Sequence, residues 1–201
     1  MVEDGEWSPL LEDLLRGLVH AMNNRVTALS AYAELAAVDD DALEVSMLRQ
    51  ETLRLHQVSS LISALATRSD EREALELGGV VDLALEIHSH HPRMRSVPCA
   101  LEKIGAVLPV RVPRWAMLRL ALIMIDAAKR AAGETSSSTV VMWLSGSDVA
   151  VCLRFVSPKP LGRDAEVLSQ RCGGTLSFAN GEVVLELPSL LELRRREKAA
   201  R

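Results

Sequence analysis

The stretch LLRGLVHAMNNRVTALSAYAELA, residues 14–36, has the periodicity of a long amphipathic helix with one histidine in it. Apolar side chains recur at three- and four-residue steps from residue 8 to residue 37, which is the spacing of one face of an α-helix. Ser8 can cap this helix, and Pro9 suits its first helical position. The pattern therefore predicts a helix over residues 8–37, longer than an ordinary globular helix.

The histidine of this stretch, His20, is expected to face away from the apolar side of the helix. At 100° per residue, its side chain points roughly 165° from the centre of the apolar stripe. Asn24, Thr27 and Ala31 follow it within a narrow sector, so small or polar side chains border an exposed imidazole. A neutral imidazole nitrogen is a nucleophile at cellular pH, including toward phosphorus. Helical geometry alone leaves open whether His20 reacts or is an ordinary surface residue. The predicted stripe comprises Leu11, Leu15, Leu18, Met22, Val26, Leu29, Ala33 and Ala36.

A second helix is predicted over residues 40–68, after a tight turn at VDDDA, residues 38–42. Its apolar residues have heptad-like spacing. Two long helices joined by a few residues form an antiparallel hairpin, and such a hairpin cannot bury its own apolar seam. We therefore expect two copies of the chain to form a four-helix bundle. The seam residues of the second helix are Leu48, Leu55, Val58, Ile62 and Leu65.

The remainder of the chain has the pattern of an α/β sandwich, with helices on one face of a mixed sheet. A charged stretch at residues 67–73 separates it from the hairpin, so we expect domains at 1–70 and 71–201. Gly133 is expected just past the end of an apolar helix, and Asn180-Gly181 at a hairpin turn. The predicted elements are strands at 74–79, 97–104 and 106–112, helices at 80–90, 113–132 and 164–171, and hairpins turning at 146–148 and 180–181.

Composition excludes several classes of function. The net charge of −4 does not favour a nucleic-acid partner, which needs a basic surface. No run of 18 apolar residues or secretory signal is present, so a cytoplasmic protein without a membrane span is expected. The three cysteines form no CxxC pair, and the histidines of HSHHP, residues 88–92, lack an accompanying cysteine or carboxylate pattern. Neither group is expected to bind metal.

The stretch HAMNNRVTALSAYAELA, residues 20–36, resembles the phospho-acceptor box of two-component sensor histidine kinases, often written HDFNNLLTAILGYAELA. This resemblance implies a dimerisation and histidine-phosphotransfer hairpin with His20 as phosphoacceptor and Asn24 in support. The small or polar side chains beside the imidazole let another protein surface lie flat against the helix, so Asn23, Thr27 and Ala31 are expected to contact a docked partner. The matching residues are His20, Asn23, Asn24, Thr27, Ala28, Tyr32, Ala33, Glu34, Leu35 and Ala36.

Residues 107–132 and 171–188 are similar, more weakly, to the ATP-binding domain of the same family. The nucleotide motifs differ, however. Asp126 replaces the Mg²⁺-binding asparagine, and RFVSPKPLGRD, residues 154–164, lacks the adenine-recognising aspartate, the glycines and the room for a lid. Lys129 and Arg130 are expected to be solvated cations at a helix end. Ala21 replaces the carboxylate that acts as general base in the family. ATP binding and autokinase activity are therefore not expected.

These observations favour a homodimeric histidine phosphotransferase. His20 would take a phosphoryl group from the receiver domain of one response regulator and pass it to another. The receiver would bring its own Mg²⁺, so the protein itself would need no cofactor. Two alternatives remain open: a non-catalytic, pseudokinase-like adaptor that binds a regulator or kinase, and an atypical active histidine kinase. No nucleic-acid or membrane partner is expected.

Overall fold

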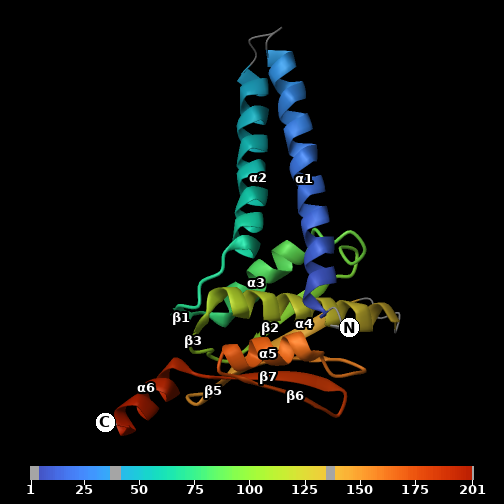
Figure 1. Cartoon of the computed structure of the whole chain (residues 1–201). Coiled ribbons are helices and arrows are strands. Elements are labelled where there is room, and N and C mark those ends of the chain that lie inside the picture. The colour runs from blue at the N-terminus through green and yellow to red at the C-terminus, as the bar shows by residue number, and fades with distance from the viewer. Residues whose placement is uncertain (1–4, 37–41, 135–138, 201) are drawn as a thin grey trace.

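The protein consists of a helical hairpin that rises from an α/β body (Figure 1), as this computed structural model shows for residues 5–36, 42–134 and 139–200. The hairpin is formed by α1 (Trp7–Ala36) and α2 (Ala42–Ala66). The predicted α+β class with an N-terminal antiparallel hairpin is thus confirmed. The turn expected at residues 38–42 lies, except for its last residue, outside the described residues. None of the described helices is long and apolar enough to span a bilayer.

The body contains a five-stranded mixed sheet of order β2-β4-β5-β7-β6. β2 and β4 are parallel and the other neighbours are antiparallel. β1 and β3 form a separate antiparallel pair instead of joining this sheet. The elements are β1 (Arg72–Leu75), α3 (Leu77–His88), β2 (Cys99–Ile104), β3 (Val110–Pro113), α4 (Arg114–Glu134), β4 (Val140–Gly146), β5 (Ala150–Val156), α5 (Arg163–Arg171), β6 (Thr175–Ala179), β7 (Glu182–Pro188) and α6 (Leu190–Ala199).

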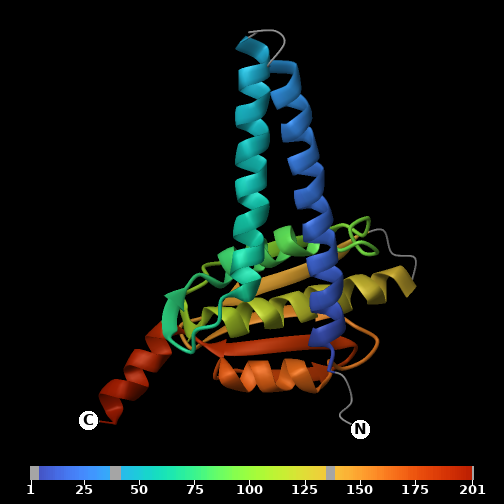
Figure 2. The ribbon, with the colours of Figure 1, turned by 45° about the horizontal axis from the view of Figure 1, so that its top comes forward.

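The core of the body lies between the five-stranded sheet and the helices α3, α4 and α5 (Figure 2). Alternate residues of the central strands point into it, as in the row in which Leu144 pairs with Leu153 and Leu153 with Leu185. All three side chains are fully buried. Alternate side chains of a strand point to opposite faces of the sheet, so this row forms the inner face. The turn at Asn180-Gly181 is also confirmed, with φ of +53° and +75°.

Two glycine-based predictions were wrong. The strand expected at 74–79 ends at Leu75, and Gly78 and Gly79 lie inside α3. A Cβ on Gly78 would lie 2.8 Å from the Cε of Lys103, at the flexible end of that side chain. Gly133 lies within the last turn of α4, not after it. In both places the helix continues through glycine because its other residues pack against the body.

The start of α1 differs from the prediction that Ser8 caps it. The helix begins at Trp7, whose N–H donates to Asp164 Oδ2 of α5 at 2.9 Å. In return, the N–H of Gly162, immediately before α5, donates to Glu6 Oε1 at 2.8 Å. The first N–H groups of a helix need acceptors, and here each of two helices receives a carboxylate from the other. These bonds tie the beginning of α1 to α5.

The apolar stripe predicted for α1 is only partly correct. Leu10, Leu14 and Leu18 are buried against the body, whereas Val26 of the predicted stripe is 47% exposed. The lower part of α1 packs on α4, so its buried face is rotated toward that helix. Higher on the hairpin, several apolar side chains lack cover in a single chain: Val19, Val26, Leu35, Val45 and Leu53. They suit the expected four-helix bundle, which stays a prediction.

The hairpin and the body share one continuous hydrophobic core. Leu14 and Leu18 of α1 and Leu61 of α2 belong to the same buried cluster as the apolar residues of α4. At Gly17 the contact is so close that a Cβ would lie 1.8 Å from the carbonyl oxygen of His90. A side chain at this position would have to displace backbone, so the lower half of α1 is firmly seated on the body. The division into domains at residue 70 stays a prediction.

Candidate functional site

His20 is exposed on α1, as predicted, and its ring contacts Asn24. The Nδ2 of Asn24 lies 3.3 Å from the Nε2 of His20. An amide NH2 group can only donate, so this contact is a hydrogen bond when Nε2 carries a lone pair and Nδ1 carries the proton. In that tautomer, Nε2 has the lone pair that can act as a nucleophile.

The other residues of the predicted site lie along the same helix. Asn23, Thr27 and Ala31 are all exposed, and the Oγ1 of Thr27 donates to the carbonyl of Asn23 at 3.0 Å. Ala21 is half-buried and packs against the core. Asn24 is the one hydrogen-bond partner recorded for the His20 ring among the described residues. The structure therefore places a single supporting amide beside the imidazole, and the docking role of its neighbours stays a prediction.

A buried polar cluster lies below His20, between α1, α3 and α4, and sequence reasoning did not find it. His88 and His91 are fully buried and stacked, with ring centroids 5.1 Å apart. The Nε2 of His88 lies 3.3 Å from Asp126 Oδ1, and the Nε2 of His91 lies 3.6 Å from Asp13 Oδ2. His88 is the last residue of α3 and His91 lies in the connection that follows it, while their carboxylate partners come from distant positions in the sequence.

The hydrogen bonds of His91 define its tautomer. Its Nδ1 accepts the backbone N–H groups of Arg93 and Met94, each at 3.2 Å. Nδ1 must therefore be unprotonated, and the neutral ring carries its proton on Nε2, facing the carboxylates. A histidine that binds metal through Nε2 would need the opposite arrangement. The described residues contain no group of three or more metal-ligand side chains suited to an ion.

Burial controls the ionisation of this cluster. Desolvation lowers the pKa of His88, with a smaller contribution from Lys129, and outweighs the opposing effect of Asp126. Desolvation likewise lowers the pKa of His91, and the neighbouring His88 lowers it further. Burial acts to raise the pKa of Asp126, but hydrogen bonds from His88 and Arg130 hold it below its usual value. The cluster thus contains two neutral histidines and an ionised Asp126.

We expect the free energy of unfolding to fall as the pH is lowered below about 6.5. The buried His88 and His91 have a lower pKa in the folded chain, so the unfolded chain takes up protons first. Each histidine then removes up to about 1.4 kcal/mol per pH unit. Urea unfolding at pH 7.5, 6.5 and 5.5 measures this slope, and a His91→Gln variant should show a shallower one. Equal stability at the three pH values would contradict the neutral state of the cluster.

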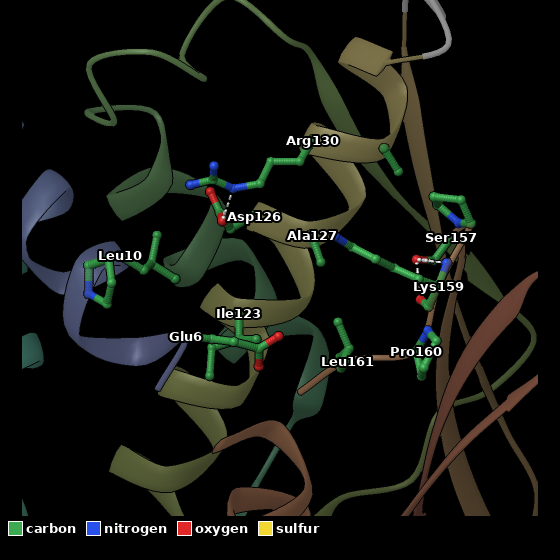
Figure 3. A pocket seen from close by; sticks show the side chains of 13 residues that line it. Glu6, Leu10, Ile123, Asp126, Ala127, Arg130, Ser157, Lys159, Pro160 and Leu161 are labelled. Carbon is green, nitrogen blue, oxygen red and sulfur yellow. Dashed lines mark hydrogen bonds and ion pairs between the residues drawn. The ribbon is translucent and has the colours of Figure 1, made fainter. Parts of the chain in front are cut away.

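The carboxylate of Asp126 is engaged by side chains of the protein itself (Figure 3). Asp126 Oδ2 accepts from the Nε of Arg130 at 2.6 Å, while its other oxygen faces His88. Lys129 is buried and donates to the carbonyl of Met94 at 3.4 Å, so the prediction that it is solvated was wrong. The α3–β2 connection covers its ammonium group. Both oxygens of Asp126 are therefore already engaged.

A cavity of about 300 Å³ remains beside Asp126, between α4, α1 and the connection from β5 to α5. Leu10 of α1 and Glu6, which precedes this helix, form one wall, and Ser157 and Pro160 belong to the opposite one. The Oγ of Ser157 donates to the carbonyl of Lys159 at 2.6 Å and tightens this short connection. The β5–α5 connection is therefore a compact turn, not a lid.

Comparison with known proteins gave likenesses of fold at low sequence identity. No family model and no curated protein matches the chain. Acinetobacter baumannii histidine kinase AdeS is 13% identical, with a TM-score of 0.46 over 85% of this chain and 96% of that chain. A bacterial phosphotransferase is 12% identical, with a TM-score of 0.42 over 89% and 95%. The ATP-binding domain of PrrB from Mycobacterium tuberculosis is 14% identical, with a TM-score of 0.48 over 59% and 97%. The function is therefore argued from the site itself.

Proposed function

We propose that the protein is a histidine phosphotransferase that relays a phosphoryl group through His20 between receiver domains of response regulators. The observation that carries this proposal is the exposed imidazole whose Nε2 is held as a lone-pair acceptor by Asn24. The resemblance of residues 20–36 to a phospho-acceptor box supports the same role. The receiver supplies the phosphoaspartate and its Mg²⁺, so this chain needs to supply only a nucleophile and a docking surface.

In the proposed transfer, the amide of Asn24 releases the Nε2 lone pair of His20 as the receiver docks, and this lone pair then attacks the phosphorus of an aspartyl phosphate. The P–N bond forms as the P–O bond to the acyl oxygen breaks, and the aspartate leaves as a carboxylate. No proton has to leave Nε2 before the attack, because the ring keeps its proton on Nδ1. A general base next to the histidine is then unnecessary, which is compatible with Ala21. The amide of Asn24 can hydrogen-bond an oxygen of the transferred group.

The surroundings of Asp126 support a relay over a kinase. An autokinase must bind Mg²⁺ and ATP, yet here the carboxylate is engaged by His88 and Arg130. The wall that α1 forms beside this region is anchored through Trp7 and Glu6 to the start of α5. Because the lower half of α1 shares a core with the body, we infer that the body stays seated and does not swing toward His20.

The choice of phosphoryl donor tests this proposal. The purified protein is incubated with γ-labelled ATP, and separately with labelled phosphorylated receiver domains. We expect label only from a receiver, with mass spectrometry locating it on His20. Label from ATP alone would identify an atypical kinase instead. No label from either donor, with receiver binding retained, would identify an adaptor.

A further inference from the structure

The surface directly below His20 is formed by the body, not by the hairpin. One side of α1 presents four residues in a line, Asp13, Gly17, His20 and Asn24. At 100° per residue, these positions lie within about 60° of each other around the helix axis. The α3–β2 segment, residues 89–98, covers the lower two. It contacts Asp13 and places the carbonyl of His90 against Gly17. His20 is therefore the first exposed residue of this line above the segment.

The α3–β2 segment is held in place by buried groups. His91 is fully buried and accepts the N–H groups of Arg93 and Met94. Lys129 of α4 donates to the carbonyl of Met94. Three hydrogen bonds from buried side chains thus define the backbone from which Arg93 projects.

Two arginines of this segment face solvent. The side chain of Arg93 is 70% exposed, and its Nη2 lies 3.7 Å from Asp13 Oδ2. This distance exceeds that of a charge-assisted hydrogen bond, so its guanidinium donors remain available. Arg95 is also exposed, and no ion pair is recorded for it among the described residues. Asp13 lies two helical turns, about 10 Å, below His20, so Arg93 lies on the same side of α1 below the imidazole, and Arg95 follows it two residues later in the segment.

We propose that the α3–β2 segment is a second docking surface for the receiver domain, on which Arg93 and Arg95 oppose carboxylates around the phosphoaspartate. This inference rests on the proposed function. A receiver that presents an aspartyl phosphate with Mg²⁺ brings a dianion and the carboxylates that hold the cation. Arginine matches the geometry of carboxylates, and opposite charges at a rim speed encounter and orient the partner. Arg93 and Arg95 are therefore positioning residues, and the phosphoryl group passes only to His20.

Transfer rates measured against receiver concentration test this surface. Arg93→Gln and Arg95→Gln should each raise the KM for the phosphorylated receiver about two- to fivefold, with kcat unchanged. Arg93→Lys should recover most of the loss. Added salt should raise the KM of the wild type more than that of the Arg93→Gln/Arg95→Gln double variant. Salt screens the attraction between the arginines and the receiver, which only the wild type has.

Arg194→Gln is the matched control, since Arg194 is exposed on α6, far from the hairpin (Figure 1). Its KM should equal that of the wild type. Unchanged KM values in both segment variants, with active wild type, would overturn the docking surface and leave the relay intact. A wild type that accepts no label would instead refute the relay itself. Arg93→Gln could lower the melting temperature, because Arg93 lies next to Asp13. In that case Arg95→Gln tests the docking surface, because the Arg95 side chain has no hydrogen bond or ion pair with the described residues of α1.

Discussion

Replacing His20 by alanine is expected to abolish acceptance of a phosphoryl group from a receiver, a loss of more than about 10³-fold. The exposed Nε2 of this ring is the proposed nucleophile, and Asn24 next to it cannot take its place. Labelled phosphorylated receiver is mixed with the variant, and the label on the protein is counted over time. The variant should fold normally, because the ring is exposed and its one recorded hydrogen bond is to Asn24.

His56→Ala is the matched control for this experiment. His56 is likewise an exposed histidine on a hairpin helix, but it lies on α2. Its loss should leave the amount of label unchanged. Equal labelling of the His20→Ala variant and the wild type would show that another residue accepts the phosphoryl group. The proposed relay through His20 would then be wrong.

Replacing Asp126 by alanine is expected to lower the free energy of unfolding by about 1 to 3 kcal/mol. The change removes the acceptor for His88 Nε2 and for Arg130 Nε in a buried place. The buried His88 Nε2 then loses its partner without regaining water, whereas the exposed guanidinium of Arg130 stays solvated. Urea unfolding at pH 7.5 measures the difference, since both buried histidines are neutral at that pH.

Asp148→Ala separates this effect from the loss of an ordinary surface ion pair. Asp148 pairs with Arg195 at 3.2 Å on an exposed part of the body. Its removal should cost less than about 1 kcal/mol. Asp126→Asn, which keeps the side-chain shape, should fall between the two variants. An Asp126→Ala protein as stable as Asp148→Ala would mean that the cluster contributes little to holding the helices together.

Local pattern was sufficient for part of the fold. The hairpin helices, the inner faces of β4, β5 and β7 and the turn at Asn180-Gly181 all follow from periodicity or turn chemistry within a short stretch. The exposure of His20 and its contact with Asn24 follow in the same way, because both residues belong to one helix and are four positions apart.

Contacts between distant segments could not be predicted in this way. Ser8 had the chemistry of a cap, but Asp164 provides the acceptor for Trp7 across 157 positions of the chain. Lys129 had the sequence pattern of a solvated helix end, but in the structure it is buried and donates to the carbonyl of Met94 in the α3–β2 segment.

By itself, then, the sequence determined that a histidine and an asparagine stand together on the outer side of a long helix, because helical angles depend only on spacing. Only the tertiary structure decided what lies below them. It brings Asp13, His91 and Asp126 from three separate elements into one buried cluster and places Arg93 at its rim. Such contacts depend on how α1 packs on α4. Periodicity within a helix does not say which distant charged residue the helix will contact.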